Sequence, residues 1–457
     1  MYLFYLIISL GTLLFIDYIV LFKKELSAPS FLFAAGMFIC SLSLSLYTEE
    51  WNINIHAGTF WLIFGGVLSF TLGCLVVQLA KGNLQITSST LSEKNIIRLT
   101  PIIKVKRLKM IFFSIIVLYL IKVYFLMSYY GGGSLAAALV LHTEALKFGD
   151  DAMKLPFGLS FFVGLPDICG NIFAYLSAVY SFKKNFRRQR NWIWAIFVLC
   201  LVGSLLSSGR TFMLWMIVAF GVSYFICMKH NNIQINVKKI TITLLAIYTF
   251  AMSFQQLGYL IGREESEDSG LSVFVEYCGA EIQNLDDFIY SDHIQVKTTH
   301  FGEVTLENFW ANFKVKSHRD EVLYFNSRRG YGLGNVRTTF HNYYIDFGFW
   351  GTFIVCFVIG IFIQSIYSKL KNCNIWQTGR MTVLLYVFIS LIPACFMSFF
   401  SEYYISRMWA LFNYRIWLGY IMICYVIYGT LSFKRLNKNG KTLLSRLEII
   451  GPEKAWI

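Results

Sequence analysis

Apolar residues fill long uninterrupted runs along this chain, and short polar segments, most of them basic, separate the runs. A helix of about 20 apolar residues is long enough to cross the hydrocarbon core of a bilayer. The pattern therefore predicts an all-α polytopic membrane protein with about 11 transmembrane helices. The predicted spans are roughly 2–22, 29–47, 58–80, 110–129, 159–182, 192–208, 211–228, 240–261, 347–369, 382–401 and 416–433.

Composition supports this class. Of the 457 residues, 56% are hydrophobic and 14% are charged, and the mean hydropathy is +0.56. The first apolar run has no basic flank and no small-residue cleavage pattern, so we expect a retained span and not a signal peptide. The ten cysteines show neither a CxxC pair nor a Cys/His metal spacing.

The distribution of basic residues predicts the topology. Of the 40 lysine and arginine residues, 26 lie in alternate segments between the spans and 13 lie in the opposite set. Basic loops face the cytoplasm, so we expect a multi-pass membrane protein with its N-terminus outside and its C-terminal tail in the cytoplasm. The net charge of +14 is then a topology signal and an attraction to anionic lipid. It does not indicate a nucleic-acid site.

The same reading divides the chain in order. We expect eight spans in residues 1–261, a large extracytoplasmic (periplasmic) loop in 262–346, three spans in 347–433 and a basic cytoplasmic tail in 434–457. Within the loop, apolar residues keep helical spacing over 274–289 and over 306–313. These segments predict short amphipathic helices. They fit equally well on the membrane surface or in a small packed subdomain.

The end of the loop, RRGYGLGNVRTTFHNYYIDFGFWG (328–351), concentrates polar chemistry where the chain re-enters the membrane. Its glycines suit a turn or a close backbone approach, and Asn335 or Thr338 suits a helix N-cap. A cation, an imidazole and a phenol follow at i, i+4 and i+7, on one face of the expected helix: Arg337, His341 and Tyr344.

Arginines on the expected outer side are the main functional signal. A guanidinium donates two parallel hydrogen bonds, which suits phosphate and carboxylate. Each arginine alone is also compatible with a position at the membrane interface or with an ion pair to an acidic loop residue. As a set they predict a substrate-binding site. The predicted substrate-binding residues are Arg210, Arg328, Arg329, Arg337, Tyr344, Arg407 and Arg415.

Three residues near the expected outer ends of spans are candidates for a general base. His341 can accept a proton near neutral pH, and Asp346 and Glu402 are rival carboxylates. No acidic pair has the spacing of a metal site, so we expect neither a metal nor another cofactor. Inside the spans, Lys122 and Asp167 have matching depths and are expected to form a structural ion pair, a proton pathway being the alternative.

The chain resembles the bacterial oligosaccharide repeat-unit polymerases, the Wzy-type O-antigen and capsule polymerases. The resemblance rests on SGRTF at 208–212, the single large outer loop, GNVRTTFHNYYIDFGFWG at 334–351 and SEYYISR at 401–407. Topology and length match over the whole chain, but the motifs cover only a few tens of residues. The resemblance implies a GT-C-like arrangement of membrane helices.

The resemblance also implies a reaction. A growing glycan leaves its undecaprenyl diphosphate and is transferred to the terminal sugar hydroxyl of a new lipid-linked repeat unit, on the outer face of the membrane. The enzyme would be a metal-independent glycosyltransferase of lipopolysaccharide or other surface-polysaccharide biosynthesis. Its partners would be undecaprenyl-diphosphate-linked oligosaccharides, membrane lipid and a chain-length regulator. An O-antigen ligase acting on lipid A core is the nearest alternative, and a transporter of lipid-linked oligosaccharide is a more distant one.

Overall fold

The computed structural model describes residues 1–81, 100–101, 103–131, 133–148, 155–207, 210–233, 270–290, 298–313 and 326–429, with residues 153, 256 and 315. The described part is almost entirely helical, apart from one two-stranded hairpin. The chain forms two compact units, and each is discontinuous in sequence. Unit 1 comprises 1–85, 271–371 and 391–412, and unit 2 comprises 86–270, 372–390 and 413–457.

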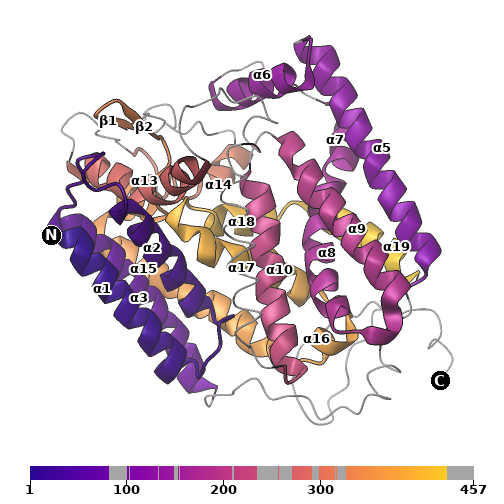
Figure 1. The fold of residues 1–457 in the computed structure, drawn as a ribbon, viewed down its shortest axis with the longest axis horizontal. Helices are drawn as coiled ribbons and strands as arrows, with labels where there is room; N and C mark the ends of the chain where they lie inside the picture. Colours follow the sequence, from indigo (N-terminus) through magenta and orange to yellow (C-terminus); the bar gives the residue numbers. More distant parts are fainter. Residues whose placement is uncertain are drawn as a thin grey trace. The chain divides into compact units, whose positions relative to one another are not determined.

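Unit 1 is built on apolar helices that run beside one another, with the loop elements gathered near the ends of these helices (Figure 1). Its main packing is between α3 and α15, with α1 and α2 alongside α3. Its elements are α1 (Tyr2–Ile16), the π-helical turn η1 (Asp17–Leu21), α2 (Pro29–Ser45), α3 (Ala57–Ala80), α13 (Gly270–Tyr290), α14 (Glu307–Asn312), β1 (Asn326–Arg328), β2 (Tyr331–Gly334), α15 (Phe340–Leu370), η5 (Met397–Phe399) and α18 (Tyr404–Ala410).

Small residues allow the close packing of α3 on α15. A Cβ at Gly73 would lie 2.2 Å from the Phe357 carbonyl oxygen, and one at Gly360 would lie 2.3 Å from the Phe70 carbonyl oxygen. Glycine at these positions lets two backbones approach, as is common between membrane helices. The two longest helices of the unit are thereby held in one register.

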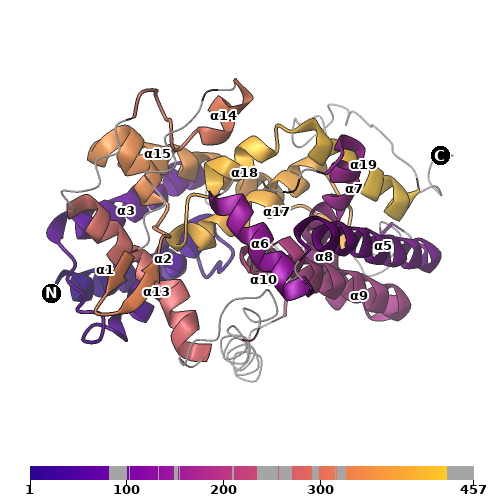
Figure 2. The same ribbon diagram turned by 90° about the horizontal axis from the view of Figure 1, so that it is seen from above.

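Unit 2 packs α8 against α9 and α10, with α5 beside α9. Figure 2 shows α8 and α9 next to α5 in the second view. Helix α17 (Val383–Phe396) begins in unit 2 and ends in unit 1. The other elements of unit 2 are α5 (Val105–Tyr130), α6 (Leu135–Phe148), α7 (Phe157–Val163), α8 (Leu165–Ser181), η2 (Lys184–Phe186), α9 (Arg187–Gly203), η3 (Ser204–Ser207), α10 (Thr211–His230), α16 (Ile375–Thr378) and α19 (Tyr414–Tyr428).

The prediction of an all-α membrane protein is confirmed at the level of class. Among the described residues, seven helices are long and apolar enough to cross a membrane, or eight if α18 and α19 form one bent span. Helix α2 and the segment Val383–Phe399 are apolar but shorter. The predicted span at 240–261 lies outside the described residues apart from position 256, so the count of 11 stays a prediction.

Within each unit, the loops assigned to the basic side lie together. In unit 1, Lys371 contacts Glu25, and the Lys81 ammonium donates to the Ser365 carbonyl. In unit 2, the Lys183 ammonium donates to Thr100 and to the Thr378 carbonyl. These contacts are what an alternating topology requires, because each loop returns to the same end of its bundle. Which end faces the cytoplasm stays a prediction from the cation bias.

The burial of helix α13 bears on one of the alternatives left open by the sequence. Its polar residues Glu281, Gln283, Asn284 and Asp286 are all buried. A helix lying on a membrane surface would leave its polar face in water, so the contacts favour the small packed subdomain. In unit 2, Asp167 lies near enough to Lys122 to attract its ammonium, and the expected ion pair between them stays a prediction.

Candidate functional site

The glycine-rich stretch near the end of the predicted outer loop is a β-hairpin. Arg328 pairs with Tyr331, which leaves Arg329 and Gly330 as a two-residue turn with φ of 49° and 85°. Positive φ at both positions defines a type I′ turn, which matches the twist of the strands. Arginine is unusual at the first position, where asparagine, aspartate or glycine is preferred. The turn places the Arg329 side chain on the exposed surface of unit 1.

The two arginines of the hairpin have different partners. Arg328 forms a bidentate pair with Asp287, at 3.1 Å from Nε to Oδ2 and 2.5 Å from Nη2 to Oδ1, and its Nη1 donates to the Asn52 carbonyl at 2.7 Å. Arg329 Nη1 donates to the Glu49 carbonyl at 2.9 Å. Arg328 is therefore occupied by a structural carboxylate, whereas Arg329 is bonded through one nitrogen and remains exposed.

Helix α13 anchors the hairpin through polar side chains one turn apart. Asn284 Nδ2 donates to the carbonyls of Leu333 and Val336 at 2.8 and 2.9 Å. Asn326 Nδ2 donates to Asn284 Oδ1 at 3.0 Å and to Asp287 Oδ2. Buried amides are stable only when they are hydrogen-bonded, and these bonds account for the burial of Asn284. The hairpin position is therefore set by α13.

Arg337 precedes helix α15 and does not lie on it, contrary to the expectation of a helix beginning near 335–338. The N-cap of α15 is Thr339, whose side chain makes no capping bond. The preceding backbone is tied elsewhere: the Val336 carbonyl accepts from Asn284, and the Thr339 N–H donates to the Ser398 carbonyl at 2.9 Å. These tertiary bonds override the capping preference of Asn335 and Thr338.

Arg337 nevertheless contacts His341, and both side chains are buried. Arg337 Nη1 lies 3.3 Å from His341 Nε2, and the guanidinium lies over the Phe288 ring at 5.0 Å. Burial lowers the pKa of Arg337 to about 10, with Asp287 opposing the shift, so the guanidinium is charged at neutral pH. Unit 1 thus holds a buried positive charge at its loop-bearing end, the end where α13, the hairpin and the start of α15 lie.

The hydrogen bonds of His341 fix its protonation. Arginine has donors only, so Nε2 accepts, and Nδ1 carries the proton and donates to Asn342 Oδ1 at 3.1 Å. The imidazole is therefore neutral, and both ring nitrogens are engaged. In this arrangement His341 orients Arg337 and has no free nitrogen for a substrate proton.

The two carboxylates predicted as rival bases hold backbone segments. Asp346 accepts the N–H groups of Val304 and Thr305 at 3.2 and 2.6 Å, which fixes that segment against α15. Glu402 accepts from Tyr343, Ile405 and Ser406 and so caps the start of α18. Burial raises the pKa of Glu402, and these hydrogen bonds partly offset the rise. Both geometries favour structural roles.

The remaining predicted residues lie on both units. Tyr344 and Arg407 belong to unit 1 and are half-buried. Arg210 is buried at the N-cap of α10, and the Arg415 N–H is capped by Asn413 Oδ1 at 3.0 Å at the start of α19, both in unit 2. Unit 1 therefore brings together the hairpin, Arg337, His341, Asp346 and Glu402. Arg210 and Arg415 are positioned by helix ends of the other unit.

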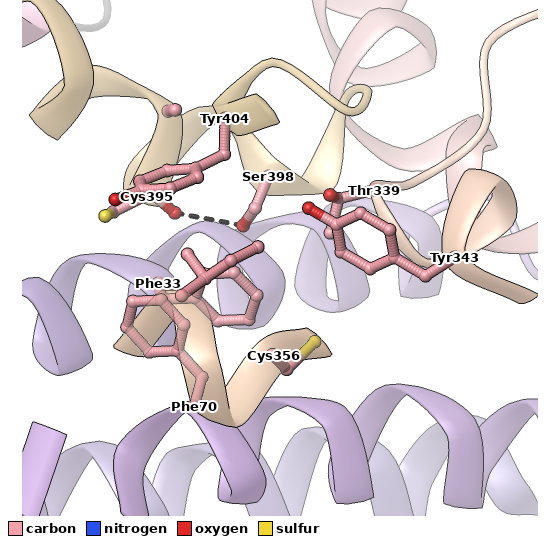
Figure 3. A pocket seen from close by; sticks show the side chains of 10 residues that line it. Phe33, Phe70, Thr339, Tyr343, Cys356, Cys395, Ser398 and Tyr404 are labelled. Atoms are coloured by element: carbon pink, nitrogen blue, oxygen red, sulfur yellow. Dashed lines mark hydrogen bonds between the residues drawn. The ribbon is translucent and has the colours of Figure 1, made fainter. Parts of the chain in front are cut away.

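A narrow pocket lies beneath this end of unit 1. Figure 3 shows the facing rings of Phe33 and Phe70 on one side, Tyr404 above them, and Tyr343 with Thr339 at the other end. The Phe33 and Phe70 rings stack at 4.3 Å, and the Tyr343 hydroxyl donates to Glu402 at 3.1 Å. The lining is almost entirely apolar, and the free space is only about the size of one water molecule.

One pair of residues escaped the sequence reasoning. His56 Nδ1 lies 2.8 Å from Asp286 Oδ2, and the imidazole stacks on Tyr290 at 4.2 Å. The two residues are 230 positions apart, and neither belongs to a recognisable motif. The only available signal was a histidine in a short outer loop directly before an apolar helix, together with an acidic residue on an amphipathic segment.

Among the described residues, no group of three or more His, Cys, Asp or Glu side chains is arranged to hold a metal ion. Comparisons with protein-family models, with curated proteins and with solved structures find no match to this chain. Fold and site together define an all-α protein with apolar helices of spanning length and a folded polar end on unit 1.

Proposed function

We propose that the protein is a surface-polysaccharide polymerase of the bacterial inner membrane. It transfers a growing glycan from undecaprenyl diphosphate to the terminal sugar hydroxyl of a new lipid-linked repeat unit. The observation that carries the proposal is the set of arginines at the loop-bearing end of unit 1, next to helices of spanning length. Arg329 is exposed there, and Arg337 is buried and charged.

The chemistry of the donor requires such cations. The leaving group is a diphosphate whose lipid tail remains in the membrane, so its charge must be stabilised at the membrane surface. Arg329 offers an exposed guanidinium, and Arg337, oriented by the neutral His341, offers a fixed positive field. Arg328 is occupied by Asp287 and positions the hairpin. Arg407, which also belongs to unit 1, completes the proposed set of cations.

The direct test uses purified full-length protein in lipid nanodiscs, given undecaprenyl-diphosphate-linked repeat units from the source strain. A polymerase releases undecaprenyl diphosphate and produces lipid-linked glycans longer than one unit, whereas a transporter produces no new covalent product. In cells lacking the protein, lipid A core carrying a single repeat unit supports the polymerase. Bare core with accumulated lipid-linked polymer would support a ligase instead.

The first prediction concerns Arg337. Replacement by lysine keeps the charge but removes the planar guanidinium that His341 orients, and with it the fixed direction of the positive field at the proposed site. Loss of one electrostatic interaction that stabilises the transition state typically costs about 2.7–4 kcal/mol, or about a hundred- to a thousand-fold in rate. Initial rates in nanodiscs measure the effect, and Lys184→Arg is a control at an exposed position. Full activity of Arg337→Lys at normal protein level would remove Arg337 from the site.

A further inference from the structure

The His56–Asp286 pair has the geometry of an oriented imidazole. Asp286 Oδ2 lies 2.8 Å from His56 Nδ1, and Oδ1 accepts the His56 backbone N–H at 2.9 Å and the Thr59 hydroxyl at 2.5 Å. The Asp286 side chain is 1% exposed and that of His56 is 45% exposed. A buried carboxylate thus holds an imidazole that opens to the surroundings.

The bond to Asp286 also fixes the tautomer. With the carboxylate accepting, the proton of the neutral ring sits on Nδ1, and Nε2 presents its lone pair. Nε2 has no hydrogen-bond partner among the described residues. The Tyr290 ring supports one face of the imidazole, and the Tyr290 hydroxyl accepts the Gly58 N–H at 3.0 Å. The ring plane is therefore set by two contacts from α13.

Capping of helix α3 does not explain the histidine. Asp286 reaches the start of α3 through the backbone N–H of residue 56 and the Thr59 hydroxyl, and any side chain at position 56 would preserve both bonds. His56 is the N-cap of α3, yet its side chain makes no capping bond, and histidine is not a preferred N-cap residue. The imidazole is held by Asp286 but is not required by the helix.

The same short segment contacts the hairpin arginines. Arg329 and Arg328 donate to the carbonyls of Glu49 and Asn52, a few residues before His56 in the chain. The charged groups beside the imidazole come from α13: Asp286, and next to it Asp287, which is paired with Arg328. An exposed guanidinium and an oriented imidazole are therefore carried by one corner of unit 1.

We propose that His56, positioned by Asp286, is the general base of the glycan transfer. This inference rests on the proposed function and assigns the base within it. His56 Nε2 takes the proton of the acceptor hydroxyl as that oxygen bonds to C1 of the donor sugar. The bond between C1 and the phosphate oxygen breaks, and its electron pair leaves with undecaprenyl diphosphate. The imidazolium then returns its proton to the diphosphate or to water.

His341 does not fill this role in the structure, because its Nε2 accepts from Arg337 and its Nδ1 donates to Asn342. Asp346 and Glu402 each accept two or more protein donors. His56 is the histidine of unit 1 that combines a buried carboxylate partner with a solvent-facing nitrogen among the described residues. The division of roles is then a base at His56 and an oriented cation at Arg337.

The test compares His56→Gln, His56→Gly and a control, His300→Gln, in the nanodisc polymerisation assay. His300 is an exposed histidine in the segment before α14, and it lies against Trp310. General-base catalysis contributes about 10²- to 10⁴-fold, so both His56 variants should lose that much rate and His300→Gln should lose none. Glycine is tolerated at an N-cap, and it leaves space in which added imidazole should restore part of the rate.

Imidazole rescue separates a base from a structural residue. Added imidazole should raise the rate of His56→Gly and leave the rates of wild type and His300→Gln unchanged. If His56→Gln retains the wild-type rate, or if His56→Gly gains no rate from added imidazole, the assignment is overturned while the polymerase proposal stands. If wild-type protein forms no glycan at all, the polymerase proposal fails and this inference fails with it.

Discussion

Unit 1 and unit 2 each bury a lysine at the end assigned to the cytoplasm, and the two lysines have different partners. In unit 1, Lys371 Nζ lies 3.2 Å from Glu25 Oε2, and both side chains are 1% exposed. In unit 2, Lys183 Nζ donates to Thr100 Oγ1 at 2.9 Å and to the Thr378 carbonyl at 2.7 Å, and lies over the Tyr180 ring at 4.7 Å. Among the described residues, no carboxylate pairs with Lys183.

The partners decide how each lysine titrates. Burial lowers the pKa of Lys371, and the Glu25 carboxylate opposes that shift. Burial lowers the pKa of Lys183 to about 7, and Cys227 opposes the shift. Neutral acceptors compensate a buried charge less well than a carboxylate does. A carboxylate therefore favours the charged form of Lys371, whereas Lys183 has only neutral acceptors and a pKa near 7.

The same contrast recurs at the hairpin of unit 1. Arg328 is paired with Asp287, while the adjacent Arg329 donates to a backbone carbonyl. A cation already paired with a carboxylate has most of its donors occupied, so it serves the fold more than a ligand. The comparison therefore gives the two hairpin arginines different roles: Arg328 holds the fold, and Arg329 is available to a ligand.

The largest effect is expected at the Lys371–Glu25 pair. Glu25→Gln leaves a buried ammonium without its carboxylate, a change that typically costs about 3–5 kcal/mol. Thermal or denaturant unfolding in detergent should show the loss directly. Adding Lys371→Met to Glu25→Gln removes the uncompensated charge and should restore most of the stability. A double variant no more stable than the single one would contradict an interaction between the two charges.

Lys183 should make the unfolding free energy depend on pH. Its folded pKa of about 7 lies below the ordinary lysine value of about 10.4, so between these values the unfolded chain binds more protons. The unfolding free energy therefore rises with pH through this window, by at most about 1.4 kcal/mol per pH unit. Below about pH 7 the buried lysine is charged, and the full cost of burying that charge lowers the unfolding free energy.

The measurement is the unfolding free energy of Lys183→Met and wild type at several pH values. The difference between them should change across the window and level off below about pH 7. Lys184→Met, at the exposed neighbouring position, should follow the wild-type profile. Parallel profiles for Lys183→Met and wild type would show that Lys183 keeps its proton in the folded state.

The helices were predictable from sequence because a long run of apolar residues indicates a helix that is buried in lipid or in the protein core. Most predicted spans coincide with observed helices, such as 58–80 with α3 and 211–228 with α10. The loop-bearing end of unit 1 was less predictable, because its geometry depends on side chains far away in the sequence. Asn284 holds a hairpin about 50 residues away, and Asp286 orients a histidine 230 residues away. No local pattern encodes such pairs.

The start of α15 shows, at one position, where prediction from local sequence fails. The sequence favours a cap at Asn335 or Thr338, but the Val336 carbonyl and the Thr339 N–H bond to Asn284 and Ser398 instead. The spacing of Arg337 and His341 still predicted their proximity, although through a turn before the helix and not on a helix face. Spacing identified the neighbours, and tertiary hydrogen bonds decided the geometry.

The smallest expected effect concerns Arg329, the hairpin arginine that donates to a backbone carbonyl. A residue other than glycine with positive φ is strained, and asparagine adopts this conformation more readily. Arg329→Asn should therefore raise the unfolding free energy by up to about 1 kcal/mol, because the exposed bond to Glu49 that is lost contributes little. Arg329→Lys keeps both charge and strain, so its stability should match wild type.

Activity should move in the other direction. If Arg329 contacts the diphosphate, Arg329→Asn lowers the polymerisation rate while stabilising the protein, and Arg329→Lys retains part of the rate through its charge. Strain that persists at an exposed position, with a more stable alternative one substitution away, is then explained by the ligand that the side chain binds. An Arg329→Asn protein that is more stable and fully active would show that the arginine has no such role, and would leave Arg337 as the cation of unit 1 on which the proposal depends.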